Sequence, residues 1–229
     1  MEYRQVCSAS RRDLLECPDE EELRVRTERE TGRAGGDAAQ IDVRERILET
    51  ASGLFYRRGV RAVGVDVVVE AAGVAKTSLY RYFRTKDDLI AAFLQREDLD
   101  FWATWDGVAE QHGQDGEAEL EAHMAWIGER VGRRGYRGCP QLNVAAEFPE
   151  ADHPARIVAR SHKAQLRDRL KGIAERLGVD RPDDLAAQLA VVINGAFVSS
   201  EVLAGDDATA VLLRMARGLV AAARSGRPA

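Results

Sequence analysis

The 229-residue chain contains no apolar run that approaches the roughly 18 residues a membrane-spanning helix needs. Its first residues include no apolar segment typical of a secretory signal. Three cysteines, Cys7, Cys17 and Cys139, are too few and too scattered for a disulfide framework or a structural zinc site. The histidines lack a close metal-binding spacing such as His-x-x-x-His. We therefore expect a cytoplasmic protein with no membrane partner, no metal and no cofactor.

The net charge of −5 is unevenly distributed along the chain. Between residues 41 and 90, nine Lys and Arg stand against seven Asp and Glu, a net charge of +2, so the remainder carries −7. The overall negative charge argues against a protein that coats nucleic acid non-specifically. A mildly basic segment in an otherwise acidic chain is compatible with one DNA-binding domain.

The first 40 residues differ from the rest of the chain. Glu, Asp and Arg dominate them, apolar residues are sparse, and Gly32, Gly35 and Gly36 stand near their end. Such a segment buries too little apolar surface to offset the entropy that is lost on ordering. We predict a flexible charged extension over residues 1–40.

From residue 41 onward the apolar residues recur at helical spacing. The first helix should place five of them on one face: Ile47, Leu48, Ala51, Leu54 and Phe55. Gly59 follows in the position of a C-terminal cap. No segment alternates apolar and polar residues between hairpin turns. The chain is therefore expected to be all-α, with a three-helix domain over residues 41–84 joined to a larger helical domain over residues 85–229.

Capping signals indicate where the later helices begin. Thr85 and Asp88 have the spacing of a capping box, which opens a long helix. Pro140 and Pro154 suit the first turns of two further helices. The last two helices are expected over residues 182–203 and 208–224, and Asp206 or Asp207 caps the second of them.

Residues 65–83 predict a helix-turn-helix. A helix of about eight residues ends at Gly73, which can adopt the positive φ of a sharp turn, and a second short helix follows. Val74, Leu79 and Phe83 are spaced to pack against the first of these helices. The residues left for the outer face are Lys76, Thr77, Ser78, Tyr80, Arg81 and Tyr82. They offer the cations and hydroxyl groups that a DNA groove needs.

Residues 71–89, AAGVAKTSLYRYFRTKDDL, resemble the DNA-binding signature of the TetR family of transcriptional regulators. The similarity extends roughly over residues 43–93, about a quarter of the chain. It implies a homodimer that binds double-stranded operator DNA through three-helix domains. It also implies a helical C-terminal domain that dimerises and holds a small-molecule effector.

The resemblance assigns roles to individual residues. It places Lys76, Thr77 and Ser78 at the start of the recognition helix, where base and phosphate contacts are made. It also implies that Tyr80 and Tyr82 touch the DNA backbone. Arg81 takes a variable position that sets specificity, and Lys86 anchors a phosphate from the next helix. Asp66 stands where the family often has Thr or Ser. It can cap its helix, but a carboxylate faces phosphate badly, so it is left out of the predicted contacts.

The predicted effector site rests on aromatic residues and on one short segment. The segment RGCPQLNVAAEF, which begins at Arg137, resembles the Gly-Cys…Asn…Glu segment of one TetR subgroup, on a helix expected to line the pocket. Its Cys, Asn and Glu share one helical face. The expected pocket-lining residues are Trp102, Trp126, Cys139, Asn143, Glu147 and Phe197.

Two other interpretations of this region stay open. Glu147, His153 and His162 can be imagined as a metal site, although solvated or hydrogen-bonded histidines are the simpler interpretation. A nucleophilic pair of Cys139 with a histidine would make the chain an enzyme, yet no positioned base or oxyanion loop is recognisable in the sequence.

The final two helices carry more apolar surface than a small domain needs for itself. The expected dimer-interface residues are Leu185, Leu189, Val192, Ile193, Ala196, Val211, Leu212, Met215 and Leu219. In the TetR family the two final helices form a four-helix interface with those of the partner. The alternative is a larger core within one chain.

The sequence thus predicts a ligand-responsive, homodimeric, sequence-specific DNA-binding regulator, not an enzyme. We expect a repressor that a small apolar or amphipathic effector releases from its operator. The main alternative is a small-molecule-binding protein without operator binding. An all-α enzyme that uses the Cys139 region is a further, less favoured alternative.

Overall fold

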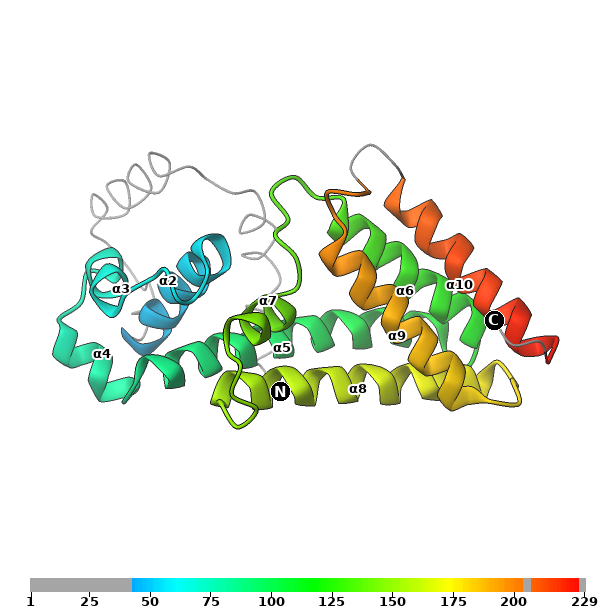
Figure 1. Cartoon of the computed structure of the whole chain (residues 1–229), viewed down its shortest axis with the longest axis horizontal. Helices are drawn as coiled ribbons and strands as arrows, with labels where there is room; N and C mark the ends of the chain where they lie inside the picture. Colours follow the sequence, from blue (N-terminus) through cyan, green and yellow to red (C-terminus); the bar gives the residue numbers. More distant parts are fainter. Residues whose placement is uncertain (1–42, 204–206, 227–229) are drawn as a thin grey trace, which may run out of the picture. The chain divides into compact units, whose positions relative to one another are not determined.

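The structure, a computed structural model, describes residues 43–203 and 207–226, in which every regular element is an α-helix (Figure 1). The helices are α2 (Val43–Arg58), α3 (Val65–Ala72), α4 (Lys76–Tyr82), α5 (Lys86–His112), α6 (Gly116–Val131), α7 (Pro140–Glu147), α8 (Pro154–Arg176), α9 (Pro182–Val198) and α10 (Ala208–Arg224). The all-α prediction is confirmed for these residues. No helix among them combines the length and the apolarity that crossing a membrane requires. The extension expected over residues 1–40 lies outside the described part of the chain.

Helix α2 turns its apolar face inward, as its spacing predicts. The five residues expected on that face are all buried: Ile47, Leu48, Ala51, Leu54 and Phe55. Gly59 has a φ of +85°, and its N–H donates to the Phe55 carbonyl oxygen at 2.9 Å. This left-handed conformation, which only glycine adopts at little cost, ends the helix and sends the chain toward α3.

Helices α3 and α4 form the predicted helix-turn-helix. Gly73 adopts a φ of +60° between them, and its N–H donates to the Glu70 carbonyl oxygen at 3.1 Å. Leu79 and Phe83 are buried against the neighbouring helices, and Val74 is half-buried. Three apolar side chains therefore fix the inner face of this short segment and leave its polar face outward.

Helix α5 connects the two hydrophobic cores of the described residues. The predicted capping box is present: the Thr85 hydroxyl accepts from the Asp88 N–H and the Asp88 carboxylate accepts from the Thr85 N–H, both at 3.0 Å. The first half of α5 belongs to the core beneath the helix-turn-helix, which continues along this helix to Leu94. From Phe101 onward α5 contributes to the second core. The predicted domain boundary at residue 85 therefore falls at the start of a helix that serves both cores.

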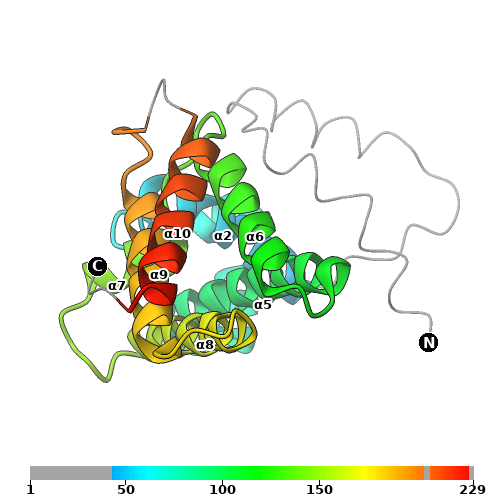
Figure 2. The same ribbon diagram turned by 90° about the vertical axis from the view of Figure 1, so that its right-hand side faces the viewer.

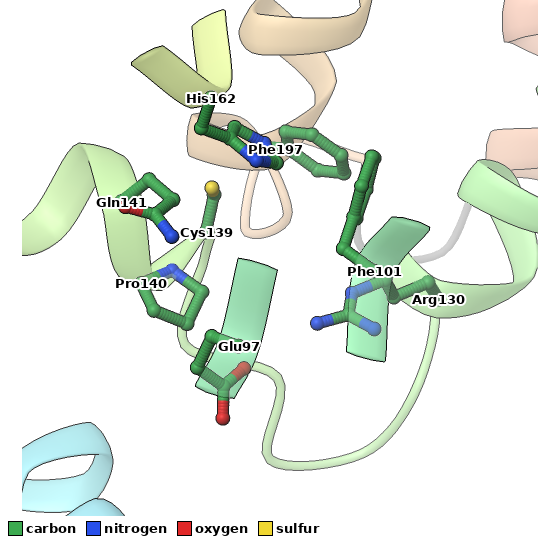
Figure 3. Close-up of a pocket in the computed structure, with 8 residues that line it drawn as sticks. All are labelled: Glu97, Phe101, Arg130, Cys139, Pro140, Gln141, His162 and Phe197. Atoms are coloured by element: carbon green, nitrogen blue, oxygen red, sulfur yellow. The ribbon is translucent and has the colours of Figure 1, made fainter. Parts of the chain in front are cut away.

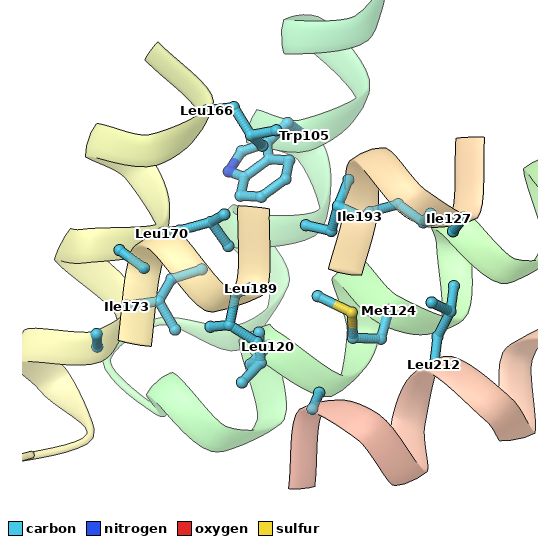
Figure 4. Packing of buried hydrophobic residues seen from close by; sticks show 14 of the residues in the cluster. Trp105, Leu120, Met124, Ile127, Leu166, Leu170, Ile173, Leu189, Ile193 and Leu212 are labelled. Carbon is cyan, nitrogen blue, oxygen red and sulfur yellow. The ribbon is translucent and has the colours of Figure 1, made fainter. Parts of the chain in front are cut away.

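The second core lies among α5, α6, α8, α9 and α10, which lie in front of α2 in the view of Figure 2. Helix α6 packs most extensively on α10, and α8 on α9. Large apolar side chains from these helices meet in its centre (Figure 4): Trp105, Leu120, Met124, Ile127, Leu166, Leu170, Ile173, Leu189, Ile193 and Leu212. The burial of these apolar side chains is the main contribution to the stability of the bundle.

Helix α9 ends earlier than the sequence predicts. It stops at Val198, not at residue 203, and the Ser199 N–H donates to the Ala196 carbonyl oxygen at 3.2 Å, a tight closing turn. Serine side chains compete with the backbone for hydrogen bonds, so the pair Ser199 and Ser200 favours an end to the helix here. Asp207 caps α10 as expected, because its side chain accepts from the Ala210 N–H at 3.0 Å.

The close approach of α6 to α10 depends on a glycine. A Cβ atom placed on Gly128 would lie 2.5 Å from the Cα of Thr209, a backbone atom that a rotamer change cannot move away. Gly128 is buried, so the two helices must separate if this position gains a side chain.

We expect Gly128→Ala to lower the free energy of unfolding by about 1–3 kcal/mol, the usual cost of forcing extra atoms into a packed contact. Urea unfolding followed by circular dichroism measures it. The matched control is Gly172→Ala on α8, where the new Cβ meets only the end of the Arg176 side chain at 3.8 Å. Equal stability of the two variants would contradict the role of Gly128.

Candidate DNA interface and effector site

The side chains predicted to contact DNA gather on the outer face of α4. Lys76, Thr77, Tyr80, Arg81 and Tyr82 are exposed, and Ser78 is half-buried. Two tyrosines left 43% and 37% exposed on a seven-residue helix are unusual for a helix that only packs. Lys86 is half-buried at the start of α5, and this burial lowers its pKa below the ordinary value.

Asp66 does not cap α3, contrary to the sequence expectation. The N-cap residue is Gly64, and no side chain accepts from the first turn of the helix. The Asp66 carboxylate instead lies 2.6 Å from the Lys76 ammonium, which raises the pKa of Lys76. Both side chains are more than half exposed, so water and salt weaken this pair. A DNA phosphate that contacts Lys76 must compete with Asp66 for it.

A narrow cavity of about 10 Å³ lies in the second core (Figure 3). It is lined by Glu97, Phe101, Arg130, Cys139, Pro140, Gln141, His162 and Phe197. Cys139 and Phe197 were among the residues predicted from the sequence to line the effector site. The cavity accommodates a water-sized group as it stands, so a larger effector requires its side chains to move.

Several polar groups in the cavity were missed by the sequence prediction. His162 is buried, and its Nδ1 lies 2.6 Å from the Asp98 carboxylate. Burial lowers the pKa of His162, although the hydrogen bond to Asp98 opposes this shift. Burial also raises the pKa of Glu97. His162 precedes the buried Leu166 by four residues, so its place on an apolar helical stripe was a signal that it faces inward.

Trp102 and Trp126 stand behind the cavity and not on its wall. Both rings pack on Phe101, with centroid distances of 4.9 and 5.1 Å. The Trp102 indole N–H donates to Asp98 at 2.9 Å. These two tryptophans therefore hold cavity residues in place, and the expectation that they line the cavity itself is corrected.

Asn143 and Glu147 also lie outside this cavity. They line a second hollow of about 160 Å³ beside α2, together with Tyr56 and Arg137. The physical reason is the rise of the helix: eight residues advance α7 by about 12 Å, so its two ends reach different parts of the structure. Cys139 at the N-cap of α7 lines the narrow cavity, while Asn143 and Glu147 further along the helix line the hollow beside α2.

Glu147 joins α7 to the segment that follows α2. Its carboxylate accepts from the Val60 N–H at 3.1 Å and from the Arg61 N–H at 2.9 Å. Gly59 leaves room for this contact, since a Cβ there would stand 3.2 Å from a Glu147 oxygen. Two backbone donors next to the helix-turn-helix are thus satisfied by one side chain of α7.

The other end of α7 is tied to the same helix. The Tyr56 hydroxyl of α2 accepts from the Arg137 N–H at 2.9 Å and donates to the Gly138 carbonyl oxygen at 3.4 Å. The Arg137 guanidinium donates to the Tyr56 carbonyl oxygen at 3.2 Å, and the Asn143 amide donates to the Arg137 carbonyl oxygen at 2.6 Å. Asn143 therefore holds the loop before α7, which is a structural contact that the sequence prediction did not foresee.

The other histidine considered for a metal site also has a structural contact. His153 Nδ1 accepts from the Ala155 N–H at 3.2 Å and so caps α8, and its ring stacks on Phe148 with centroids 3.8 Å apart. Within the described residues no group of three His, Cys, Asp or Glu side chains is arranged to hold a metal ion.

The structure divides the predicted dimer-interface residues into two groups. Five are buried within the chain and belong to its own core: Leu185, Leu189, Ile193, Ala196 and Leu212. Four are half-buried or exposed and remain available to a partner: Val192, Val211, Met215 and Leu219. Near them the sequence prediction missed three valines of high exposure, Val191, Val198 and Val202. For the buried five, the alternative of a larger intramolecular core is the better description.

A short helix with polar side chains outward, behind a tight glycine turn and supported by two further helices, defines a DNA-binding protein of the helix-turn-helix class. Residues 47–93 match the family model of the bacterial regulatory proteins of the tetR family. The structure of a TetR-type transcriptional regulator from Streptomyces avermitilis is similar with a TM-score of 0.72 and 34% identity, over 80% of this chain and 98% of that one. The chain therefore belongs to the TetR family, whose members are transcriptional regulators and not enzymes.

Other relatives support the same assignment. The TetR-family regulator SCO4454 from Streptomyces coelicolor matches with a TM-score of 0.76 and 26% identity, over 81% of this chain and 97% of that one. The transcriptional repressor KstR of Mycolicibacterium smegmatis is 40% identical over 62 residues, 27% of this chain and 30% of KstR. The chain spans little more than a quarter of the length of several curated transcriptional regulators that it matches.

We expect Glu147→Gln to speed amide hydrogen exchange at Val60 and Arg61 by roughly fivefold or more. The two N–H groups bind different oxygens of the carboxylate, and the Gln side chain has only one carbonyl oxygen. One N–H therefore keeps a neutral acceptor and the other loses its acceptor, at a cost of about 1 kcal/mol or more. Hydrogen exchange read by NMR measures it. Glu150→Gln, an exposed change three residues further on, serves as the control. Unchanged exchange at both amides in Glu147→Gln would contradict the role assigned to this carboxylate.

Proposed function

We propose that the protein is a homodimeric repressor that binds operator DNA with sequence specificity and is released from it by a small apolar or amphipathic effector. The observation that carries the proposal is the outer face of α4, where Lys76, Thr77, Tyr80, Arg81 and Tyr82 are exposed together while Leu79 is fully buried. The relative KstR is a transcriptional repressor, which supports repression by this protein. Chromosomal operator DNA implies a cytoplasmic site of action.

The proposed DNA contacts follow from the position of each side chain on α4 and α5. Lys76, Thr77 and Ser78 lie in the first turn of α4, where their cation and hydroxyl groups suit bases and phosphates. Tyr80 and Tyr82 suit the DNA backbone. Lys86 anchors a phosphate from the start of α5, where the helix N-terminus also favours an anion. Together with Arg81 these residues form the proposed recognition surface.

Dimerisation is proposed through the outer faces of α9 and α10. Val191 and Val198 of α9 are 71% and 67% exposed, and Met215 of α10 is 47% exposed. The half-buried Val192, Val211 and Leu219 come from the same two helices. An apolar surface shared by two adjacent helices suits a self-complementary contact with a second copy. Two recognition helices must then lie about 34–36 Å apart to enter successive major grooves.

The effector is proposed to act through α7. The narrow cavity lies beside Cys139 at one end of this helix, and the Glu147 contact with the Val60 and Arg61 amides lies at the other. An effector that binds one arrangement of α7 better than another shifts the population toward it, and DNA affinity changes by the same coupling factor.

We expect Arg81→Ala to weaken operator binding by about 1–3 kcal/mol and to relax base preference at one position of each half-site. Fluorescence anisotropy with DNA from upstream of the gene, against shuffled DNA, measures both effects. Arg167→Ala, an exposed change of the same charge on α8, is the control. Wild-type affinity and selectivity in Arg81→Ala would refute the assignment of this side chain.

We expect Met215→Glu to convert the dimer to monomer at micromolar concentration, because two carboxylates would face one another or an apolar surface across the interface. Sedimentation velocity gives the mass of the particle. The control is Leu99→Glu, an equally drastic change at an exposed residue of α5. If the two variants have the same mass as the wild type, the outer face of α10 is not the interface.

One observation favours the alternative of a ligand-binding protein that does not bind an operator. Asp66 neutralises Lys76, one of the cations of the recognition surface. The anisotropy experiment separates the two candidates. No preference for any genomic fragment, followed by no enrichment in a selection over the whole genome, would support the alternative.

A further inference from the structure

The surroundings of Cys139 differ from those of an ordinary buried cysteine. Its side chain is 6% exposed, lines the narrow cavity and stands at the N-cap of α7. The Lys163 Nζ lies 3.7 Å from its Sγ. Burial lowers the pKa of Lys163, and the contact with the Cys139 sulfur opposes that shift. The Lys163 ammonium and the N-terminal end of α7 give this thiol the surroundings that are typical of reactive cysteines.

Two further side chains of the cavity have polar atoms without a partner. Within the described residues, neither His162 Nε2 nor Gln141 Oε1 has a hydrogen-bond partner, and each side chain belongs to a residue that is 2% exposed. Buried polar atoms in folded proteins are normally paired, because an unpaired one costs free energy. Both residues line the cavity on which the thiol lies. The cavity therefore offers hydrogen-bonding capacity that the protein itself does not use.

The hydrogen bond of His162 defines which nitrogen is free. The Asp98 carboxylate accepts a hydrogen bond, so the proton of the neutral ring resides on Nδ1 and leaves a lone pair on Nε2. A histidine oriented in this way by a carboxylate is a base for a neighbouring nucleophile. In Figure 3 the Cys139 sulfur points toward the side of the cavity where His162 lies.

We propose that Cys139 is a reactive thiol that captures small α,β-unsaturated aldehydes or ketones in this cavity. The sulfur attacks the β-carbon of the electrophile, so an S–C bond forms and the C=C π pair moves to the α-carbon. The thiol proton passes to His162 Nε2 and then to the α-carbon, so the product is a neutral thioether with its carbonyl group intact. Lys163 stands beside the thiol as a hydrogen-bond donor for the carbonyl oxygen of the adduct. The small size of the cavity restricts the class to short compounds.

An adduct on Cys139 acts directly on α7. The Cys139 carbonyl oxygen accepts from the Leu142 and Asn143 N–H groups in the first turn of the helix, at 3.1 and 3.0 Å. The preceding Gly138 is also tightly confined, since a Cβ there would stand 3.1 Å from the Phe197 carbonyl oxygen. New atoms on the sulfur therefore displace the start of α7 and loosen the Glu147 contact at its end. The inference that this movement of α7 reaches the DNA-binding helices as a signal rests on the proposed function.

The experiment uses the full chain with Cys7→Ser and Cys17→Ser, so that Cys139 is its only thiol. The probe is crotonaldehyde, followed by borohydride reduction, intact mass measurement and peptide mapping. We expect one adduct, on Cys139, that forms at least tenfold faster than on a cysteine in a short peptide. His162→Gln and Lys163→Met should each slow it about tenfold, while Lys171→Met, a matched change on α8, should leave the rate unchanged.

Two outcomes of the labelling would overturn the proposal. One is no adduct on the folded chain under conditions in which the urea-unfolded chain reacts. The other is an adduct that forms at the rate of the short peptide, whether or not His162 and Lys163 are replaced. Cys139→Ser must form no adduct, and Cys139→Ala replaces it if the serine variant does not fold.

The effect on α7 is measured without any DNA, by hydrogen exchange at Val60 and Arg61. We expect faster exchange at both amides in the adduct, and crotonaldehyde should release bound operator from the wild type but not from Cys139→Ser. An adduct that changes neither exchange nor operator binding would overturn the sensing role. The labelling and the hydrogen exchange are measured without operator DNA. If the chain forms the adduct but binds no DNA, only the proposed function is refuted. If the chain binds DNA but forms no adduct, only this inference is refuted.

Discussion

One carboxylate holds the last residue of α7 against the segment between α2 and α3. Glu147 satisfies the backbone N–H groups of Val60 and Arg61, and Val60 is itself fully buried. If these donors lost their acceptor, the segment between α2 and α3 would carry unsatisfied polar groups next to an apolar core. The position of α3 and α4 is therefore sensitive to any movement of α7. Helix α5 is a second connection to these helices, and its 27 residues contribute to both cores.

Local signals in the sequence were sufficient to predict most of the fold. The apolar face of α2, the turn at Gly73 and the capping box at Thr85 all depend on residues within about one or two helical turns of one another. These signals were confirmed because each involves short-range backbone geometry. The end of α9 was the exception. There the apolar residues continue past Val198, while the serines that follow it favour a turn.

The site was less predictable because it depends on contacts between distant segments. The helical face shared by Cys139, Asn143 and Glu147 was evident from spacing, but spacing does not reveal which neighbours each residue meets. Glu147 contacts residues 86 and 87 positions away, and His162 meets an aspartate 64 positions away. In the same way, helical periodicity cannot distinguish a leucine that packs inside its own chain, such as Leu189, from one that faces a partner.

The ion pair of Asp66 with Lys76 has a consequence for the ionic-strength dependence of DNA binding. Each phosphate that a protein neutralises releases condensed cations, and the logarithm of affinity then falls by about 0.9 per phosphate with the logarithm of salt concentration. A phosphate that takes Lys76 leaves the Asp66 carboxylate close to the DNA, where it retains cations that would otherwise be released. The salt dependence of this regulator should therefore be shallower than the number of basic side chains on its recognition surface suggests.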